Sequence, residues 1–302
     1  MELQTIEQVI DIIRKRATPK RIAVAAAADM DTLEAVIQAQ KEGLVRPQLF
    51  GDAGAIEELL KQENCTLSQY EIIHAESEKE AAEKAVASVR GGNSDLLMKG
   101  MMQTGDLMRA VIDKETGLLS EQGTISLFTI NQLTNYHKLI VMTDSGIVRD
   151  PSLRDKKGII QNAVRVLRAY GYERPKVAVL CAVEVVNPKM PETVDAEALT
   201  EMSRTGELAD CIVEGPMSMD IALNAHVARH KGYGGVVAGD PDILLWPNVL
   251  SGNIAIKAMG LCGGIKNTVA FAVGAQVPIV MTSRGSGANS KYLAILGAAA
   301  AA

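Results

Sequence analysis

The chain has 302 residues, of which 47% are hydrophobic, 22% are charged and only 3% are aromatic. This balance is typical of a globular protein with an aliphatic core, and it excludes disordered, collagen-like and coiled-coil chains. A net charge of −5 provides no broad basic surface, so we expect no nucleic-acid partner. Since a domain averages roughly 150 residues, the length allows two domains of modest size.

The cysteines and the apolar stretches of the sequence bear on where in the cell the protein is located. The four cysteines are far apart and form no C-x-x-C pair, so we expect reduced thiols and neither a disulfide framework nor a zinc site. The first 16 residues carry acids early and apolar residues at helical spacing, unlike a signal peptide. The longest nearly uncharged stretch, 267–283, is shorter than the roughly 20 apolar residues of a membrane-spanning helix. We therefore expect a cytoplasmic protein with no membrane partner.

In the first half of the chain, short β-rich runs alternate with helical periodicity, which is typical of a parallel sheet with crossover helices. Serine, threonine and aspartate mark helix starts, and glycine marks helix ends. The predicted elements are a helix capped at Thr5 with Gln8, a strand over 21–28, a helix from Asp31 or Thr32 to Gly43, a strand over 47–51, a helix from Ser77 to Gly91, a strand over 95–100 and a helix over 104–113.

The second half continues the alternation, and the fold class predicted for the whole chain is α/β. A long helix over 155–170, ending at Gly171, is the best candidate for a link between two domains. A further helix is predicted over 254–262. The predicted strands cover residues 124–130, 138–144, 176–186, 211–215, 242–246, 268–273 and 278–283.

Ligands of open α/β sheets bind beyond the carboxyl ends of the strands, so the residues that follow each strand matter most. The last strand ends in Thr-Ser-Arg-Gly before a helix opens, which offers backbone N–H groups, hydroxyls and the forked guanidinium of Arg284 to an anion. A capped surface turn with a solvated arginine is the alternative. Ser251 or Asn253 can cap the helix over 254–262 and leave an amide facing a ligand, although capping alone explains both residues equally well.

Several motifs are missing, which narrows the chemistry. The sequence contains no nucleotide-binding P-loop, no H-E-x-x-H helix, no G-x-S-x-G elbow and no convincing G-x-G-x-x-G after the first strand. His226 and His230 have the i, i+4 spacing of metal ligands, but no carboxylate or third histidine has matching local spacing. A polar helix face explains them better, and we expect no metal.

Six segments of the sequence together resemble those of a known enzyme family. The sequence is similar over nearly its whole length to the phosphate acetyltransferase and phosphate butyryltransferase family, and VEVVNPKMP with the short length is closer to the butyryltransferase branch. The segments that carry the resemblance are DLLMKGMMQTGDLMRAV (95–111), VMTDSG (141–146), VAVLCAVEVVNPKMPETVDAEAL (177–199), EGPMSMDIALN (214–224), GDPDILLWPNVLSGNIAIKAM (239–259) and PIVMTSRGSGANSK (278–291).

The resemblance implies reversible transfer of a short acyl group, with butyryl preferred, between coenzyme A and inorganic phosphate. Both are substrates, and no metal or bound cofactor is implied. The family fold is similar to that of isocitrate and isopropylmalate dehydrogenases, with two α/β domains and a cleft between them. The implied domains are 1–135 with 285–302, and 136–284. A homodimer or higher homo-oligomer is also implied.

Site residues are carried over where the motifs match. Ser283 and Arg284 match the family's Ser-Arg pair, which implies that Arg284 binds the phosphate oxygens and that Ser283 donates to the reacting carbonyl or sulfur. Asp220 matches a family aspartate after a Gly-Pro turn, with structural support as the alternative. Thr104 and Arg109 match the family's T-x-x-x-x-R pattern, again with structural support as the alternative. The substrate-binding positions that the resemblance implies are Thr104, Arg109, Ser251, Asn253 and Gly285.

One departure concerns the base. The family commonly has a carboxylate six or seven residues after that serine, proposed to deprotonate the thiol of coenzyme A, whereas this chain has Asn289 and Ser290, which are not bases near pH 7. A thiol of pKa about 8.5 is already a few per cent thiolate, so positioning with Arg284 is one solution. Asp144 or Asp220 as the base is a second, and reduced or altered activity is a third. No Cys–His or Ser–His–Asp set is apparent, which favours direct attack in a ternary complex.

Three rival functions remain at this point. Phosphate acetyltransferase differs from the butyryl enzyme only in the size of the acyl pocket, where one methylene is worth roughly 1–3 kcal/mol. A dehydrogenase of the related fold would need a metal-binding aspartate cluster and a nucleotide site, and neither is arranged convincingly. A non-catalytic sensor of acyl-coenzyme A would keep the cleft and lack the base at 289 and 290.

Overall fold

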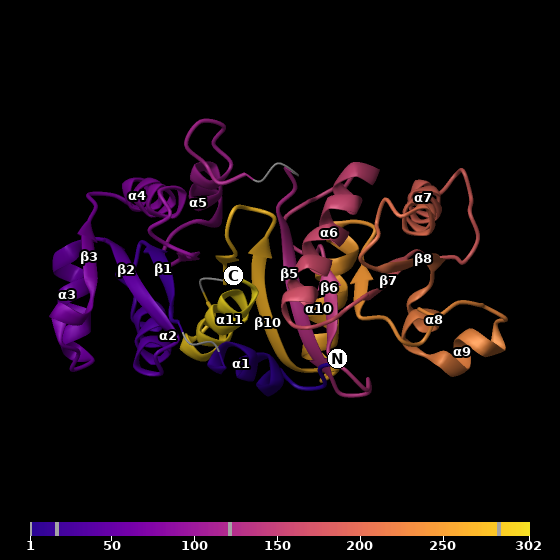
Figure 1. Cartoon of the computed structure of the whole chain (residues 1–302), viewed down its shortest axis with the longest axis horizontal. Coiled ribbons are helices and arrows are strands. Elements are labelled where there is room, and N and C mark those ends of the chain that lie inside the picture. Colours follow the sequence, from indigo (N-terminus) through magenta and orange to yellow (C-terminus); the bar gives the residue numbers. More distant parts are fainter. Residues whose placement is uncertain (1, 16–17, 120–122, 283–284) are drawn as a thin grey trace. The chain divides into compact units, whose positions relative to one another are not determined.

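The computed structural model describes residues 2–15, 18–119, 123–282 and 285–302 (Figure 1). Contacts group the chain into two compact units. Unit 1 comprises Met1–Gln8 and Thr124–Thr268, and unit 2 comprises Val9–Gly123 and Val269–Ala302. The predicted domain limits at 135/136 and 284/285 describe parts that would fold independently. Grouping by contacts does not test independent folding, so these limits stay a prediction.

Unit 2 contains a sheet in which strands β3, β2, β1, β4 and β11 follow one another, all parallel. Because they are parallel, their carboxyl ends meet at one edge of the sheet. β11 also pairs antiparallel with β10, through Ala272 and Ile279. The strand bounds are β1 Lys20–Ala25, β2 Val45–Gly51, β3 Glu71–His74, β4 Leu96–Lys99, β10 Ile265–Val273 and β11 Ile279–Val280.

Three helices of unit 2 begin at a residue whose side chain caps them, namely Asp29, Asp52 and Ser77. Ser77 accepts a hydrogen bond from the Glu80 N–H at 3.2 Å, which confirms the predicted start of α4. The predicted cap at Asp31 or Thr32 is wrong, because Asp29 caps α2 and accepts from the Thr32 N–H at 3.0 Å. The bounds are α1 Ile6–Arg14, which begins in unit 1, α2 Met30–Lys41, α3 Ala53–Gln62, the short helix η1 Leu67–Gln69, α4 Glu78–Arg90, α5 Thr104–Val111 and α11 Ala288–Ala301.

Unit 1 has a sheet in the order β5, β6, β9, β7, β8, in which β5 alone is antiparallel to its neighbour. The predicted strand over 176–186 is wrong beyond Leu180, because the apolar run continues into a turn where Val185 is 70% exposed. The bounds are β5 Ser126–Leu133, β6 Ile140–Thr143, β7 Lys176–Leu180, β8 Ile212–Met217 and β9 Ile243–Leu245.

The helices of unit 1 differ from the prediction in two places. The helix predicted over 254–262 begins earlier, at Val249, because Asn248 caps it. The helix predicted over 155–170 lies wholly inside unit 1, so it does not link the two units. The bounds are α6 Leu153–Ala169, α7 Pro191–Thr205, α8 Met219–Leu223, α9 Ala225–His230 and α10 Val249–Leu261.

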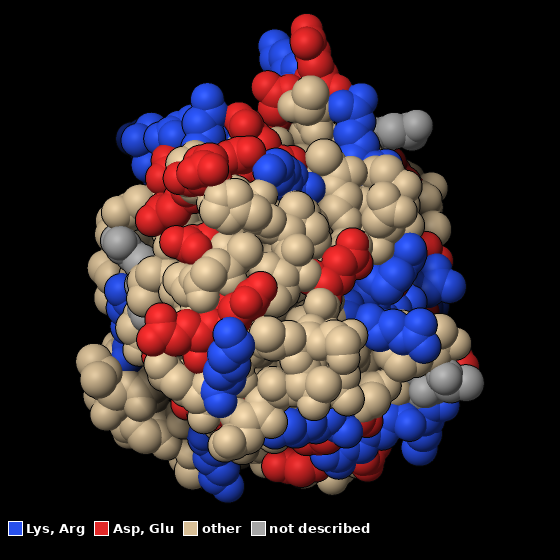
Figure 2. Space-filling view, turned by 90° about the vertical axis from the view of Figure 1, so that its left-hand side faces the viewer, with Lys and Arg blue, Asp and Glu red and all other residues tan. Residues whose placement is uncertain are grey.

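The core and surface agree with the composition. The largest fully buried side chains are mainly aliphatic, and the α/β class is confirmed. All four cysteines are free thiols. Within the described ranges, no helix is long and apolar enough to cross a bilayer. Figure 2 shows acidic and basic side chains interspersed on the face that it presents, in keeping with the small net charge.

Candidate active site

The predicted Ser-Arg pair follows the last strand of unit 2. Ser283 and Arg284 lie outside the described residues. The strand before them, β11, pairs in parallel with β4, with Val280 opposite Met98. The carboxyl end of β4 is therefore the strand end next to the carboxyl end of β11.

That strand end is closely packed. The side chain of Lys99 is buried, and its Nζ donates to the carbonyl oxygens of Gly100 at 3.2 Å and Met102 at 3.0 Å. A Cβ at Gly100 would lie 2.1 Å from the Ala26 carbonyl oxygen, so only glycine fits between the ends of β1 and β4. Lys99 is absent from the predicted site residues, although a lysine as the last residue of an otherwise apolar strand is a signal that could have identified it.

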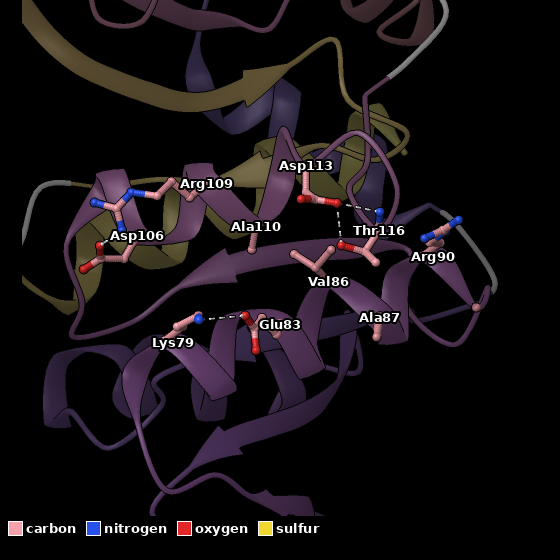
Figure 3. Close-up of a pocket in the computed structure, with 11 residues that line it drawn as sticks. Lys79, Glu83, Val86, Ala87, Arg90, Asp106, Arg109, Ala110, Asp113 and Thr116 are labelled. Carbon is pink, nitrogen blue, oxygen red and sulfur yellow. Dashed lines mark hydrogen bonds and ion pairs between the residues drawn. The ribbon is translucent and has the colours of Figure 1, made fainter.

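Thr104 and Arg109, both predicted to bind substrate, lie on α5. Thr104 is the first helical residue. Arg109 is 78% exposed and its Nη1 donates to Asp106 Oδ1 at 2.5 Å. Figure 3 shows this pair at one end of a pocket of about 1000 Å³ between α4 and α5, with a Lys79–Glu83 ion pair opposite it. Opposite charges alternate along this pocket, and Arg109 already has a carboxylate partner there.

In unit 1, Asp144 follows β6 and is 3% exposed. Its Oδ1 accepts from the N–H groups of Gly146 at 2.8 Å and Ile147 at 3.1 Å, and its Oδ2 accepts from the Val148 N–H at 2.8 Å. Burial raises the pKa of this carboxyl, and the three backbone donors act in the opposite direction. The carboxylate is thus engaged in shaping the loop over 144–148, and taking up a proton would weaken these contacts.

The first turns of α10 pack directly on that loop. Asn253 Nδ2 donates to the Ser145 carbonyl oxygen at 3.1 Å. A Cβ at Gly252 would lie 2.7 Å from Cδ1 of Trp246, which explains the glycine in the SGNI segment. Ser251 does not cap the helix: its N–H donates to the capping Asn248 side chain at 3.0 Å. Unit 1 therefore brings Asp144, Ser251 and Asn253 together, with each side chain or backbone group in a local hydrogen bond.

Asp220 lies in a second cluster of unit 1, at the start of α8. It is 51% exposed, and its Oδ2 lies 2.9 Å from Lys231 Nζ, which also lies 3.3 Å from Glu184 Oε1. Ser218 donates to Glu184. The Ser218 hydroxyl and then the Lys231 ammonium lower the pKa of Asp220 to about 2. A carboxylate of such low pKa is a weak base. No spacing signal in the sequence points to its partner Lys231.

The remaining sequence candidates are placed as follows. Gly285 is exposed in the turn that precedes α11 in unit 2. The rings of His226 and His230 are stacked with centroids 6.4 Å apart. In the described part of the chain, no group of three or more His, Cys, Asp and Glu side chains has an arrangement that could hold a metal ion.

Comparisons with known proteins match nearly the whole chain. A family model described as "Phosphate acetyl/butaryl transferase" matches residues 4–88 and 78–299. The chain is 40% identical to the phosphate butyryltransferase of Clostridium acetobutylicum over 276 residues, covering 91% of each protein. It is 35% identical to the phosphate acetyltransferase of Thermotoga maritima over 290 residues, covering 96% of this chain and 97% of the relative.

Comparison with solved structures gives the same family and fold. The crystal structure of a branched-chain phosphotransacylase from Enterococcus faecalis V583 superposes with a TM-score of 0.79 at 29% identity, covering 93% of this chain and 98% of the other. A 4-hydroxythreonine-4-phosphate dehydrogenase from Burkholderia phymatum has a TM-score of 0.52 at 14% identity, covering 95% of this chain and 99% of the other. At that identity the likeness concerns the fold alone, and it confirms the predicted dehydrogenase-like fold.

Proposed function

The chain belongs to the phosphate acetyl/butyryl transferase family, and we propose that it reversibly transfers a butyryl group between coenzyme A and inorganic phosphate. The observation that carries the butyryl preference is the 40% identity to a phosphate butyryltransferase, spread over nine tenths of both proteins. The sequence VEVVNPKMP after the β7 strand supports the same branch.

The chemistry proposed is direct attack within a ternary complex. A phosphate oxygen attacks the thioester carbonyl carbon, the tetrahedral intermediate collapses, the C–S bond breaks and coenzyme A leaves as the thiolate, giving the acyl phosphate. Arg284 would hold the phosphate oxygens through charge-assisted hydrogen bonds, and the Ser283 hydroxyl would donate to the developing oxyanion or to the sulfur. Both residues occupy the family's Ser-Arg positions in the sequence.

We further propose that no carboxylate of the chain deprotonates the thiol in the reverse direction. Asn289 and Ser290, at the positions of the family's carboxylate, are exposed non-bases. Asp144 accepts three backbone hydrogen bonds, and Asp220 has a pKa of about 2. Asp220 is therefore too weak a base. Burial raises the pKa of Asp144, but a proton there would weaken the backbone hydrogen bonds that its carboxylate accepts. The reverse reaction would then depend on thiol that is already ionised, with a pKa of about 8.5.

The other residues fit supporting roles. Asn253 and Ser251 shape the first turns of α10, and Thr104 and Arg109 begin and extend α5. We propose that these four and Gly285 bind substrate, with coenzyme A and phosphate as the only small molecules required. We also propose that the protein works in the cytoplasm as a homodimer or higher homo-oligomer. Its four free thiols are in keeping with a reducing compartment.

The test is a series of acyl donors. Coenzyme A release from acetyl-, propionyl-, butyryl- and isobutyryl-coenzyme A is followed with a thiol reagent, with and without phosphate. We expect phosphate-dependent release with the highest kcat/KM for butyryl-coenzyme A. A preference for acetyl would assign the acetyl branch, which the 35% identity to a phosphate acetyltransferase supports as the second candidate. Binding of coenzyme A with no release from any donor would indicate a sensor.

A further inference from the structure

A buried lysine occupies the first turn of α11 in unit 2. The Lys291 side chain is 4% exposed. Its Nζ donates to the Ser286 carbonyl oxygen at 2.9 Å and lies 3.4 Å from Asp29 Oδ2. The contact with Ser286 joins the helix to the turn that precedes it, and the contact with Asp29 joins the helix to a different part of unit 2.

Asp29 is itself held firmly. Its side chain is 10% exposed and caps α2, accepting from the Thr32 N–H at 3.0 Å and from the Thr32 hydroxyl. Its own N–H donates to the Ala27 carbonyl oxygen at 2.8 Å, just beyond the carboxyl end of β1. α2 and α11 pack against each other. The carboxylate that faces Lys291 is therefore fixed from the α2 side.

The position of Lys291 is unfavourable for a cation by local criteria. The first turn of a helix carries the positive end of the helix dipole, where a lysine is disfavoured. Gly287 provides no side-chain cap to offset that charge. Burial of an ammonium group adds a desolvation cost that only well-placed partners recover. The contacts of Lys291 with Asp29 and Ser286 offset the dipole and desolvation costs, and they hold the start of α11 in one geometry.

We infer that Lys291 and Asp29 form a positioning pair that holds the turn over 285–287, which directly follows the Ser-Arg motif in the sequence, and that phosphate binding depends on this pair. This inference rests on the proposed function. Ser286 is two residues after Arg284, so the chain keeps their Cα atoms within about 7 Å of each other. A displacement of about 1 Å at a reacting group can lower a rate about 100-fold. Losing the contact that holds the Ser286 carbonyl is therefore expected to impair phosphate binding.

The kinetic test compares two lysines whose Nζ atoms each donate to a backbone carbonyl oxygen at one end of α11. Lys291→Met removes the positioning pair, whereas Lys20→Met removes a lysine whose Nζ donates to the Ala302 carbonyl oxygen at 2.8 Å, at the opposite end of α11. We expect Lys291→Met to lower kcat/KM for phosphate at least tenfold and to leave KM for butyryl-coenzyme A within twofold. Lys20→Met should leave both within twofold. Asp29→Asn keeps an oxygen for capping α2 and removes the charge, so it should reproduce the phosphate-specific loss.

A second readout does not depend on turnover. Hydrogen exchange measured by mass spectrometry on peptides covering 285–291 should become faster in Lys291→Met and Asp29→Asn and stay unchanged in Lys20→Met. If the wild-type protein releases no coenzyme A, the proposed function fails while the exchange still tests the pair. Unchanged phosphate kinetics in a folded Lys291→Met protein would overturn the inference. Equal losses for phosphate and butyryl-coenzyme A would also overturn it, since they would indicate general weakening of the fold.

Discussion

Replacing Lys138 by methionine should strongly destabilise unit 1. Lys138 is 1% exposed, and its Nζ lies 2.7 Å from Asp242 Oδ1 and 2.9 Å from Asp240 Oδ1. Asp242 is 6% exposed, so without the lysine its carboxylate remains buried with no cation opposite Oδ1. Breaking a buried ion pair from one side costs about 3–5 kcal/mol, and we expect the free energy of unfolding to fall by that amount.

Of the two aspartates that contact Lys138, Asp242 should account for the lost stability, because it has fewer other partners than Asp240. Asp240 is 32% exposed, and it keeps its ion pair with Lys176 and its hydrogen bond with His137 when Lys138 is removed. Among the residues that the structure describes, the hydrogen-bond partner left to the Asp242 carboxylate is the Lys176 N–H, which donates to Oδ2 at 2.8 Å. The double variant Lys138→Met/Asp242→Asn removes the stranded charge, so it should recover part of the lost stability.

Urea denaturation of both variants and of a matched control measures this effect. The control is Lys157→Met, which breaks a 2.6 Å pair with Glu207, a residue that is 52% exposed. An exposed pair is worth at most about 1 kcal/mol, so the control should change little. If Lys138→Met lowers the free energy of unfolding no more than Lys157→Met, the reasoning from burial is refuted.

The same network gives a pH dependence with a definite sign. Burial alone would raise the pKa of Asp240, but Lys176, Lys138 and His137 outweigh it and hold that pKa well below its usual value. Such a group stabilises the fold above its unfolded pKa of about 3.9, and that stability is lost as pH falls toward the folded value. Stability should therefore decline on acidification below about pH 4, and less steeply in Lys138→Met, where one of these cations is absent.

Three further predictions concern the site. Arg284→Ala should lower turnover at least about tenfold, because it removes a charge-assisted contact to the transferred phosphate; unchanged kinetics in a folded variant would remove that role. Gly252→Ala should destabilise by about 1–3 kcal/mol in thermal unfolding, because its Cβ would meet Trp246 at 2.7 Å, whereas Gly260→Ala on the same helix meets nothing within 4 Å and should be neutral or stabilising. The initial rate of acyl-coenzyme A formation should rise with pH up to about 8.5, and a plateau beginning below pH 7 would reveal a protein base.

Local signals in the sequence predicted local structure well. The start of α4 was predictable because Ser77 and the Glu80 N–H are three residues apart. The strand over 176–186 was predicted too long, because an apolar run does not reveal where its neighbours β8 and β9 stop pairing. Three residues able to cap a helix, Asn248, Ser251 and Asn253, lie within six positions of one another, and spacing alone does not show that α10 begins directly after Asn248.

The motifs of the candidate site could be predicted from the sequence, whereas most contacts between its side chains could not. The Ser-Arg motif and the SGNI segment are continuous in sequence, so resemblance identified them directly. Lys291 and Asp29 are 262 residues apart, and Asp220 meets Lys231 only because α8 and α9 fold back on each other. No spacing rule joins such residues, since the tertiary fold alone brings them together.

The most direct test of the account is ³¹P NMR of a mixture of butyryl-coenzyme A, inorganic phosphate and the protein, with free thiol measured in parallel. The account predicts that butyryl phosphate forms in equal amount to the coenzyme A released, and that neither forms without phosphate. Coenzyme A release with no acyl phosphate would indicate hydrolysis and contradict phosphate transfer. No release, with coenzyme A still bound, would contradict catalysis itself.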